Sequence, residues 1–106
     1  MRVAAASALG ADATVDKEVR LGARARLGAG VHLAKDVRAG EDVVIGDGSS
    51  VGAEARLGDA VTLGRAVQVG RGARIGDGST IGDGAMVAAH AIVPPGTVVP
   101  AGGRFP

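Results

Sequence analysis

The sequence predicts an all-β solenoid, in which short strands of one chain stack along a single axis. Three observations predict it: a hydrophobic repeat of six residues, glycine at 19 of the 106 positions, and a single aromatic residue. Aromatic side chains normally fill a globular core, so 46% hydrophobic but 1% aromatic residues indicate a narrow core of thin repeated layers. The length fits one domain, residues 1–106.

The repeat places a large apolar residue at every sixth position, and only Ala39 departs from it. The positions are Val3, Leu9, Val15, Leu21, Leu27, Leu33, Ala39, Ile45, Val51, Leu57, Leu63, Val69, Ile75, Ile81, Val87, Val93, Val99 and Phe105. A helix cannot use this period, because successive apolar side chains would spiral around its axis.

Each hexad instead fits one short strand and one corner. The residue four places after each large apolar residue is small or β-branched, and the residue directly after it is often glycine. Two inward residues separated by one outward residue match the alternation of a strand. Pairs such as Asp47-Gly48 and Asp77-Gly78 then suit the corners, since glycine adopts positive φ at little cost.

The tandem units resemble those of the hexapeptide-repeat family, an acyltransferase-like superfamily. Residues 45–50 and 75–80 show the pattern [LIV]-G-x-x-[STAV]-x, and the resemblance covers essentially the whole chain. It implies a left-handed parallel β-helix, a triangular prism with three hexads in each 18-residue coil. Dividing 106 residues by 18 gives about six coils, without inserted loops, and a strand spacing of ~4.8 Å predicts a prism roughly 25 to 30 Å long.

An 18-residue coil places five arginines in one outward column. They are Arg2, Arg20, Arg38, Arg56 and Arg74. Like charges stacked about 5 Å apart repel one another unless acids intervene. The flanking corners carry such acids: Glu18, Asp36 and Glu54 before the column, and Glu41, Asp59 and Asp77 after it. We expect a salt-bridged surface, with an anion-binding or partner-binding ladder as the alternative.

The second face is the least charged and is the expected contact surface of a homo-oligomer. It presents Val44, Thr62, Thr80 and Val98 in one line. The resemblance implies a homotrimer with parallel prism axes. The third face gives no clear signal, because its outward residues are mixed: Thr14, His32, Ser50, Gln68, Met86 and Arg104.

The two ends of the chain differ. Pro94, Pro95, Pro100 and Pro106 all lie near the C-terminus, where a residue without an N–H blunts the edge of a sheet. Phe105 falls at an inward position and is expected to close the end of the core. The N-terminal coil has no comparable feature.

Composition excludes several kinds of partner. A net charge of +1 and the lack of stacking aromatics argue against nucleic acid, and no apolar run is long enough to cross a membrane. Without cysteine there is no thiolate nucleophile. No metal site is expected, because a catalytic zinc needs three protein ligands and the two histidines, His32 and His90, are 58 residues apart, some three coils along the axis. Without a signal for export, a cytoplasmic location is the default.

The family resemblance implies acyl transfer from acetyl-CoA or another acyl-CoA, with a histidine as general base. His90 is the candidate catalytic residue, at a corner position; His32 is an outward strand residue and the weaker candidate. No carboxylate follows His90. The sequence therefore favours a non-catalytic, self-associating structural or assembly module without a cofactor. The alternatives are a minimal acyl-CoA-dependent acyltransferase with its site between subunits, and a chain engineered or excised from a longer protein.

Overall fold

The structure, a computed structural model, describes residues 2–3, 8–10, 14–16 and 18–105, with the backbone alone at residues 2–3 and 8–9. In these ranges the chain forms two-residue strands, each beginning six residues after the one before. Sheet A contains β1 (Arg2–Val3), β4 (Arg20–Leu21), β7 (Arg38–Ala39), β10 (Arg56–Leu57), β13 (Arg74–Ile75) and β16 (Ile92–Val93). Sheet B contains β2 (Ala8–Leu9), β5 (Arg26–Leu27), β8 (Val44–Ile45), β11 (Thr62–Leu63), β14 (Thr80–Ile81) and β17 (Val98–Val99). Sheet C contains β3 (Thr14–Val15), β6 (His32–Leu33), β9 (Ser50–Val51), β12 (Gln68–Val69), β15 (Met86–Val87) and β18 (Arg104–Phe105).

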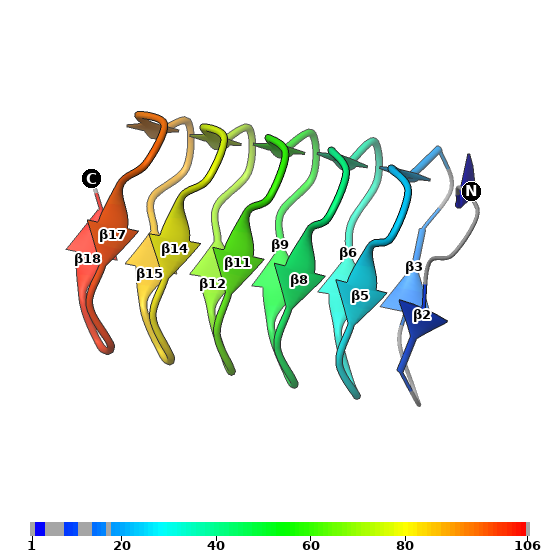
Figure 1. Ribbon diagram of the computed structural model, residues 1–106, viewed down its shortest axis with the longest axis horizontal. Coiled ribbons are helices and arrows are strands. Elements are labelled where there is room, and N and C mark those ends of the chain that lie inside the picture. Colours follow the sequence, from blue (N-terminus) through cyan, green and yellow to red (C-terminus); the bar gives the residue numbers. More distant parts are fainter. Residues whose placement is uncertain (1, 4–7, 11–13, 17, 106) are drawn as a thin grey trace.

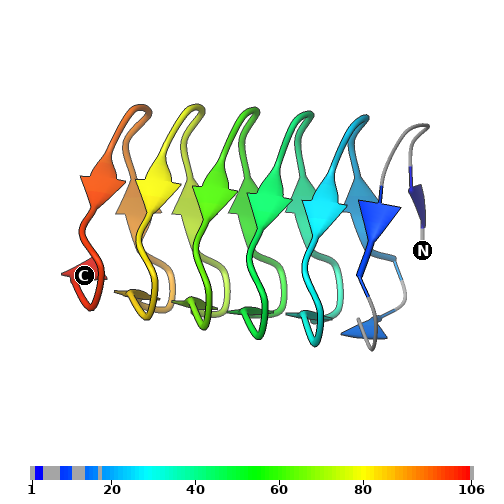
Figure 2. The same cartoon turned by 60° about the horizontal axis from the view of Figure 1, so that its bottom comes forward.

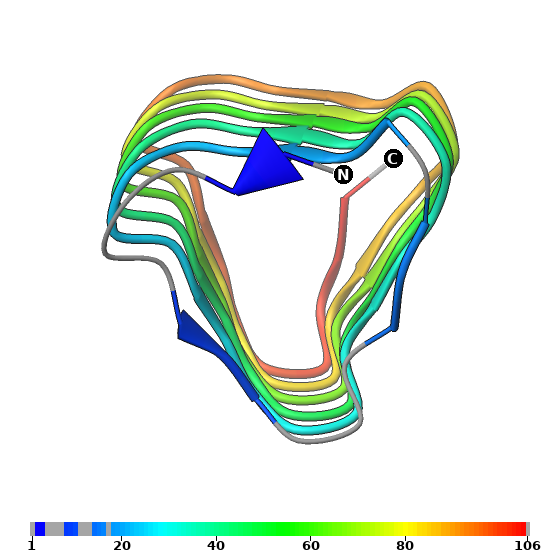
Figure 3. The same cartoon turned by 90° about the vertical axis from the view of Figure 1, so that its right-hand side faces the viewer.

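The three parallel sheets are the sides of a triangular prism, which Figure 3 shows along its axis. The coils lie side by side along the longest dimension of 30 Å, with β2 and β3 near one end and β17 and β18 at the other (Figures 1 and 2). This confirms the predicted left-handed parallel β-helix and its length. Within the described ranges, no helix is long and apolar enough to cross a membrane.

Hydrogen bonds between coils hold the stack in register. The amide N–H of Arg20 donates to the carbonyl of Val37 at 2.9 Å, and that of Gly22 donates to Ala39 at 3.1 Å. The same pattern recurs along the prism, so that described strand residues pair with the residue one coil away, as Thr62 does with Thr80. The N–H groups of these strands therefore depend on the carbonyls of the next coil, whereas corner N–H groups such as that of Gly48 donate to the preceding coil.

The core is a single column of aliphatic side chains. Leu33, Ile45, Leu63 and Ile81 are almost fully buried, and the small inward position four residues later completes each layer. Ser49 is buried too, but its hydroxyl is satisfied: Oγ donates to the carbonyl of Gly64 at 2.7 Å and accepts from the N–H of Val67 at 3.1 Å. Burial of these aliphatic groups is the main stabilising contribution.

Where glycine follows a large inward residue, the neighbouring coil leaves little room for a side chain. A Cβ on Gly46 would lie 2.6 Å from the backbone carbonyl of Gly64. Positive φ is needed two residues further on, where Gly48 has φ of 71° as expected. Non-glycine residues also occupy this position: Glu18, Arg24, Asp36, Asp42, Glu54, Ala60, Ala66 and His90. Their strain is offset in part by hydrogen bonds such as that from Asp42 N–H to the carbonyl of Ala23 at 2.9 Å.

Among the described side chains, the arginines of the column form none of the expected ion pairs with the corner acids. Among the described residues, the ion pairs are Arg24–Glu41 at 3.5 Å, Arg24–Asp42 at 2.6 Å and Arg71–Glu54 at 3.7 Å. All of these arginines lie at corners. The hydrogen bond from Arg24 Nε to Asp42 lowers the pKa of the Asp42 carboxyl and raises the pKa of Arg24.

Several corner aspartates bond to the backbone instead. Asp59 Oδ1 accepts from the N–H of Glu41 at 3.0 Å, and Asp77 Oδ1 accepts from the N–H of Asp59 at 2.9 Å. Asp47 and Asp83 make the equivalent bonds at another corner. A carboxylate oxygen in this place satisfies a corner N–H of the preceding coil. The prediction of a salt-bridged arginine face was therefore wrong, because these acids serve the corners.

The C-terminal edge has fewer donors than a regular coil. Pro94 and Pro100 occupy the position at which Gly76 and Gly82, one coil earlier, donate their N–H groups to the next coil. Two corners of the last coil thus lack this donor, in agreement with the predicted blunting of the edge. Phe105 is half-buried and packs against the core, as expected, and Pro106 lies outside the described residues.

We expect the middle of the stack to be the most sensitive to loss of volume. Leu63→Ala should lower the free energy of unfolding by about 2–5 kcal/mol, because Leu63 is enclosed by coils on both sides. Val15→Ala, in the half-buried layer near the N-terminal end, should cost less. Urea unfolding of both variants measures the difference. Equal losses would contradict the layered core.

Candidate functional site

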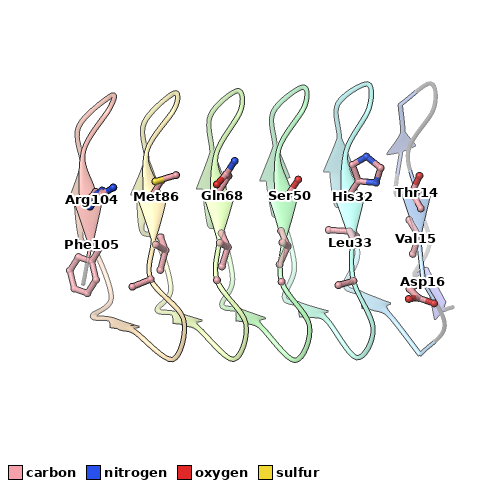
Figure 4. A pocket seen from close by; sticks show the side chains of 17 residues that line it. Thr14, Val15, Asp16, His32, Leu33, Ser50, Gln68, Met86, Arg104 and Phe105 are labelled. Carbon is pink, nitrogen blue, oxygen red and sulfur yellow. The ribbon is translucent and has the colours of Figure 1, made fainter.

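A groove runs along the outside of sheet C, parallel to the prism axis. Its volume is about 1100 Å³, and its lining extends from Thr14 in β3 to Phe105 in β18. Figure 4 shows the outward side chains in one row, in the order Thr14, His32, Ser50, Gln68, Met86 and Arg104. They stand in one row because parallel pairing in register puts residues one coil apart directly over each other.

The chemistry of the groove changes along its length. His32 and Ser50, on β6 and β9, offer an imidazole and a hydroxyl toward one end. Gln68 and Met86 follow with an amide and a flexible apolar side chain. Arg104 brings a positive charge at the far end, where it is exposed. The groove is thus suited to an elongated ligand that is anionic at one end.

Along one edge of the groove, most lining residues have little or no side chain and project little from the surface. This edge is the corner between sheets C and A, where Ala34, Gly52, Gly70 and Ala88 line the groove. Gly70 has no room for a larger side chain, because a Cβ would lie 2.4 Å from the backbone nitrogen of Ala89. The closeness of the coils therefore excludes a side chain at Gly70, whereas Asp16 begins the same column with a carboxylate.

The structure places His90 at this same corner but outside the groove lining. Its side chain is exposed, its φ is 60°, and its N–H donates to the carbonyl of Arg71 at 2.8 Å. The imidazole lies over Gly72 of the preceding coil, since a Cβ there would come 2.6 Å from His90 Nδ1. No carboxylate among the described residues forms an ion pair with this ring.

His32 lies in the groove, between Thr14 and Ser50 in the register of sheet C. The structure does not bring the two histidines together, because several coils separate them. Within the described ranges, no group of three histidine, cysteine, aspartate or glutamate residues is arranged to hold a metal ion.

Sequence reasoning did not identify the groove. Its outward residues are mixed, and a hollow depends on how far each side chain projects from the sheet. One signal was present: Ala34, Gly52, Gly70 and Ala88 share one column and carry little or no side chain. Beside the uncharged row from His32 to Met86, such a column is compatible with a surface that can receive a ligand.

Comparison with protein families agrees with the repeat. The family described as "Bacterial transferase hexapeptide (six repeats)" matches residues 60–95. No curated protein matches the chain by sequence.

Two solved structures are similar over nearly the whole chain. One is a histidine-to-alanine variant of GDP-perosamine N-acetyl transferase from Caulobacter crescentus, in complex with CoA and GDP-perosamine. It has a TM-score of 0.85 and 23% identity, and the match covers 93% of this chain and 49% of that chain. The other is the acetyltransferase domain of PglB from Neisseria gonorrhoeae in complex with acetyl coenzyme A, with a TM-score of 0.82, 20% identity, and coverage of 96% and 52%.

The chain thus spans about half the length of these structures, and at such low identity the likeness concerns the fold. The repeat is found in the sequence, in the family match and in the stacked coils. Together they show that the chain is built of hexapeptide repeats and has the left-handed parallel β-helix fold.

Proposed function

We propose that residues 1–106 form one β-solenoid domain that acts in acyl transfer from acyl-CoA, with CoA held along the groove of sheet C. The groove is the observation that carries this proposal, because its length and its graded lining match an elongated donor with an anionic end. The similar structures solved with CoA and with acetyl coenzyme A support it. The sequence favoured a non-catalytic module because its repeat is unbroken, with no loop and no convergent polar cluster. The similar structures with CoA and acetyl coenzyme A favour the alternative, an acyltransferase.

The groove offers suitable contacts for each part of acyl-CoA. Arg104 can pair with phosphate, for which a guanidinium is well suited. Met86 offers an apolar surface to the pantetheine arm, and Gln68 can exchange hydrogen bonds with its amides. Bound acyl-CoA supplies an activated acyl group. The remaining task of the chain is to orient the acceptor and take its proton.

An imidazole can take the proton from an acceptor amine or hydroxyl. His32 is the proposed base, because with phosphate at Arg104 the acyl end of an extended donor lies toward Ser50 and His32. His90, the base expected from the sequence, is exposed at the corner beside the coil of Met86, near the phosphate end, and is the alternative base.

Self-association is proposed through the face of sheet B that carries Val44, Thr62, Thr80 and Val98. Val98 is 70% exposed and Val44 is 39% exposed, and no charged side chain interrupts this row from β8 to β17. Covering this face in a homotrimer would remove apolar surface from water.

Binding of CoA or acetyl-CoA should stabilise the fold against heat. Ligand at about 100 times its dissociation constant stabilises a protein by roughly 2.7 kcal/mol, a shift that thermal unfolding resolves. Met86→Asp should abolish the shift, since it puts a negative charge in the groove beside an anionic ligand. Ala101→Asp is the matched control, at an exposed corner column where Asp47 and Asp83 already stand. No shift in the unsubstituted protein would contradict CoA binding.

Kinetics separate the roles of the two histidines. If His32 is the base, His32→Ala should lower kcat about 10²–10⁴-fold. His90→Ala should leave kcat nearly unchanged, because His90 stands near the phosphate end of the donor. The opposite pattern would reassign the base to His90, and an unchanged kcat in both variants would exclude imidazole base catalysis.

A further inference from the structure

Two neighbouring side chains of the groove have complementary chemistry. His32 on β6 and Ser50 on β9 are register partners in sheet C, about 5 Å apart at Cα. Both line the groove, and Figure 4 shows both in its outward row. Neither side chain forms a hydrogen bond or an ion pair with any part of the chain that the structure describes. The Ser50 hydroxyl and the His32 imidazole can therefore interact with each other and with a ligand.

The serine directly before Ser50 is in a different state. Ser49 points inward, where its Oγ donates to the carbonyl of Gly64 and accepts from the N–H of Val67. That hydroxyl is buried and already bonded, so it can reach neither a ligand nor a base. Ser50 faces outward, because side chains alternate along a strand, and it is half-buried at the groove.

The order of residues along the groove brings an acyl group to Ser50 before it reaches His32. With phosphate at Arg104, an extended donor lies along the outward row toward Ser50, which is three coil spacings, about 14 Å, away. Thr14 is also a register partner of His32, but on the side of the imidazole away from the donor. The Ser50 hydroxyl thus stands between the acyl carbon and the base.

We propose that Ser50 is a nucleophile and takes up the acyl group covalently, with His32 as its base. The step rests on the proposed function for its donor, acyl-CoA. Ser50 Oγ attacks the thioester carbon and forms an O–C bond, while its proton passes to the His32 imidazole. The C–S bond then breaks, and the imidazolium gives the proton to the leaving sulfur. CoA leaves as the free thiol, and Ser50 carries an ester.

The second half of the reaction regenerates the Ser50 hydroxyl. An acceptor amine, an alcohol or water attacks the ester carbon, and the His32 imidazole takes the proton of the acceptor. The bond from that carbon to Ser50 Oγ breaks, and His32 returns the proton to this oxygen. His32 is the base in both halves, in agreement with the role proposed for it above. With water as the acceptor, the net reaction is hydrolysis of the donor.

Thr14 is the positioning residue of this arrangement. It is the register partner of His32 on the side opposite Ser50, about 5 Å away at Cα. Its hydroxyl can accept a hydrogen bond from one ring nitrogen, which leaves the other nitrogen to accept the proton of Ser50. The three side chains then have the order of nucleophile, base and orienting group that activates a serine hydroxyl.

An unpaired backbone donor lies at the edge of the groove. At the corner between sheets B and C, the carboxylate of Asp47 accepts from the N–H of Ala29 in the preceding coil. At the corner between sheets C and A, the residue one coil after Ala53 is Arg71, whose side chain has no acceptor. The N–H of Ala53 forms no hydrogen bond within the described ranges, and Ala53 directly follows Gly52 of the groove lining. Such a donor can stabilise the oxyanion of acylation.

Mass spectrometry of the whole chain tests the covalent step. The protein is incubated without acceptor and quenched in acid, after exposure either to acetyl-CoA or to p-nitrophenyl acetate, an activated ester that needs no CoA site. A gain of one acetyl group that hydroxylamine removes marks an ester rather than a lysine amide. Peptide sequencing should place this ester on Ser50. Buried Ser49, and exposed Thr62 without a histidine partner on sheet B, are the internal controls and should stay unmodified.

Three positions are substituted to separate their roles. Ser50→Ala and His32→Ala should each lose the ester, and thermal unfolding verifies that both variants remain folded. Thr14→Val should slow acylation at nearly unchanged side-chain shape, and Thr14→Ser should restore the rate, because the hydroxyl orients the imidazole. An ester that persists in His32→Ala would overturn the pairing of nucleophile and base.

Kinetics detect the ester even if it is short-lived. With acetyl-CoA as donor and hydroxylamine as acceptor, release of CoA thiol should follow ping-pong kinetics, in which the acceptor concentration leaves kcat/KM for acetyl-CoA unchanged. Ser50→Ala should lose this release. Kinetics that require both substrates bound at once would overturn the covalent step.

The covalent step and the proposed function fail by different outcomes. An ester on Ser50 from p-nitrophenyl acetate alone, without a CoA-induced thermal shift, would leave the nucleophile standing and remove the acyl-CoA proposal. A CoA-induced thermal shift and acyl transfer that Ser50→Ala retains would overturn the nucleophile and leave direct transfer from acyl-CoA to the acceptor.

Discussion

The pairing of each residue with the residue one coil away determines almost everything else in this molecule. N–H groups such as that of Arg20 find their acceptors only in the next coil, so the coils must have equal length and stay in register. A single inserted residue would turn inward side chains outward in every later strand. The uninterrupted six-residue period in the sequence is the direct consequence.

This constraint explains why the fold could be predicted from the sequence. The large hydrophobic residues recur at a fixed interval, so counting along the sequence is enough to predict that Ile45 pairs with Leu63. The sequence predicted only one of the two roles of glycine. Gly48 has the positive φ expected of a turn, whereas Gly46 is required by a backbone contact with the next coil, which only coordinates can reveal.

Surface chemistry was less predictable, because a column of charges does not determine its own partners. The acids near the arginine column had the right spacing for ion pairs, yet Asp59 and Asp77 accept hydrogen bonds from corner N–H groups. An exposed guanidinium keeps its water and gains little from an ion pair. The groove escaped prediction for a related reason: the depth of a hollow depends on differences in side-chain length between one column and its neighbours.

The corner between sheets C and A shows how one constraint shapes both the backbone and the surface. At Gly70 the coils approach so closely that a Cβ has no room, and Glu54 projects from a residue with φ of 64°. The stacking that brings the coils close at the groove edge also arrays carboxylates beside it, one coil apart. Like charges at that spacing repel one another, and the ion pair of Glu54 with Arg71 at 3.7 Å offsets part of this repulsion within the chain.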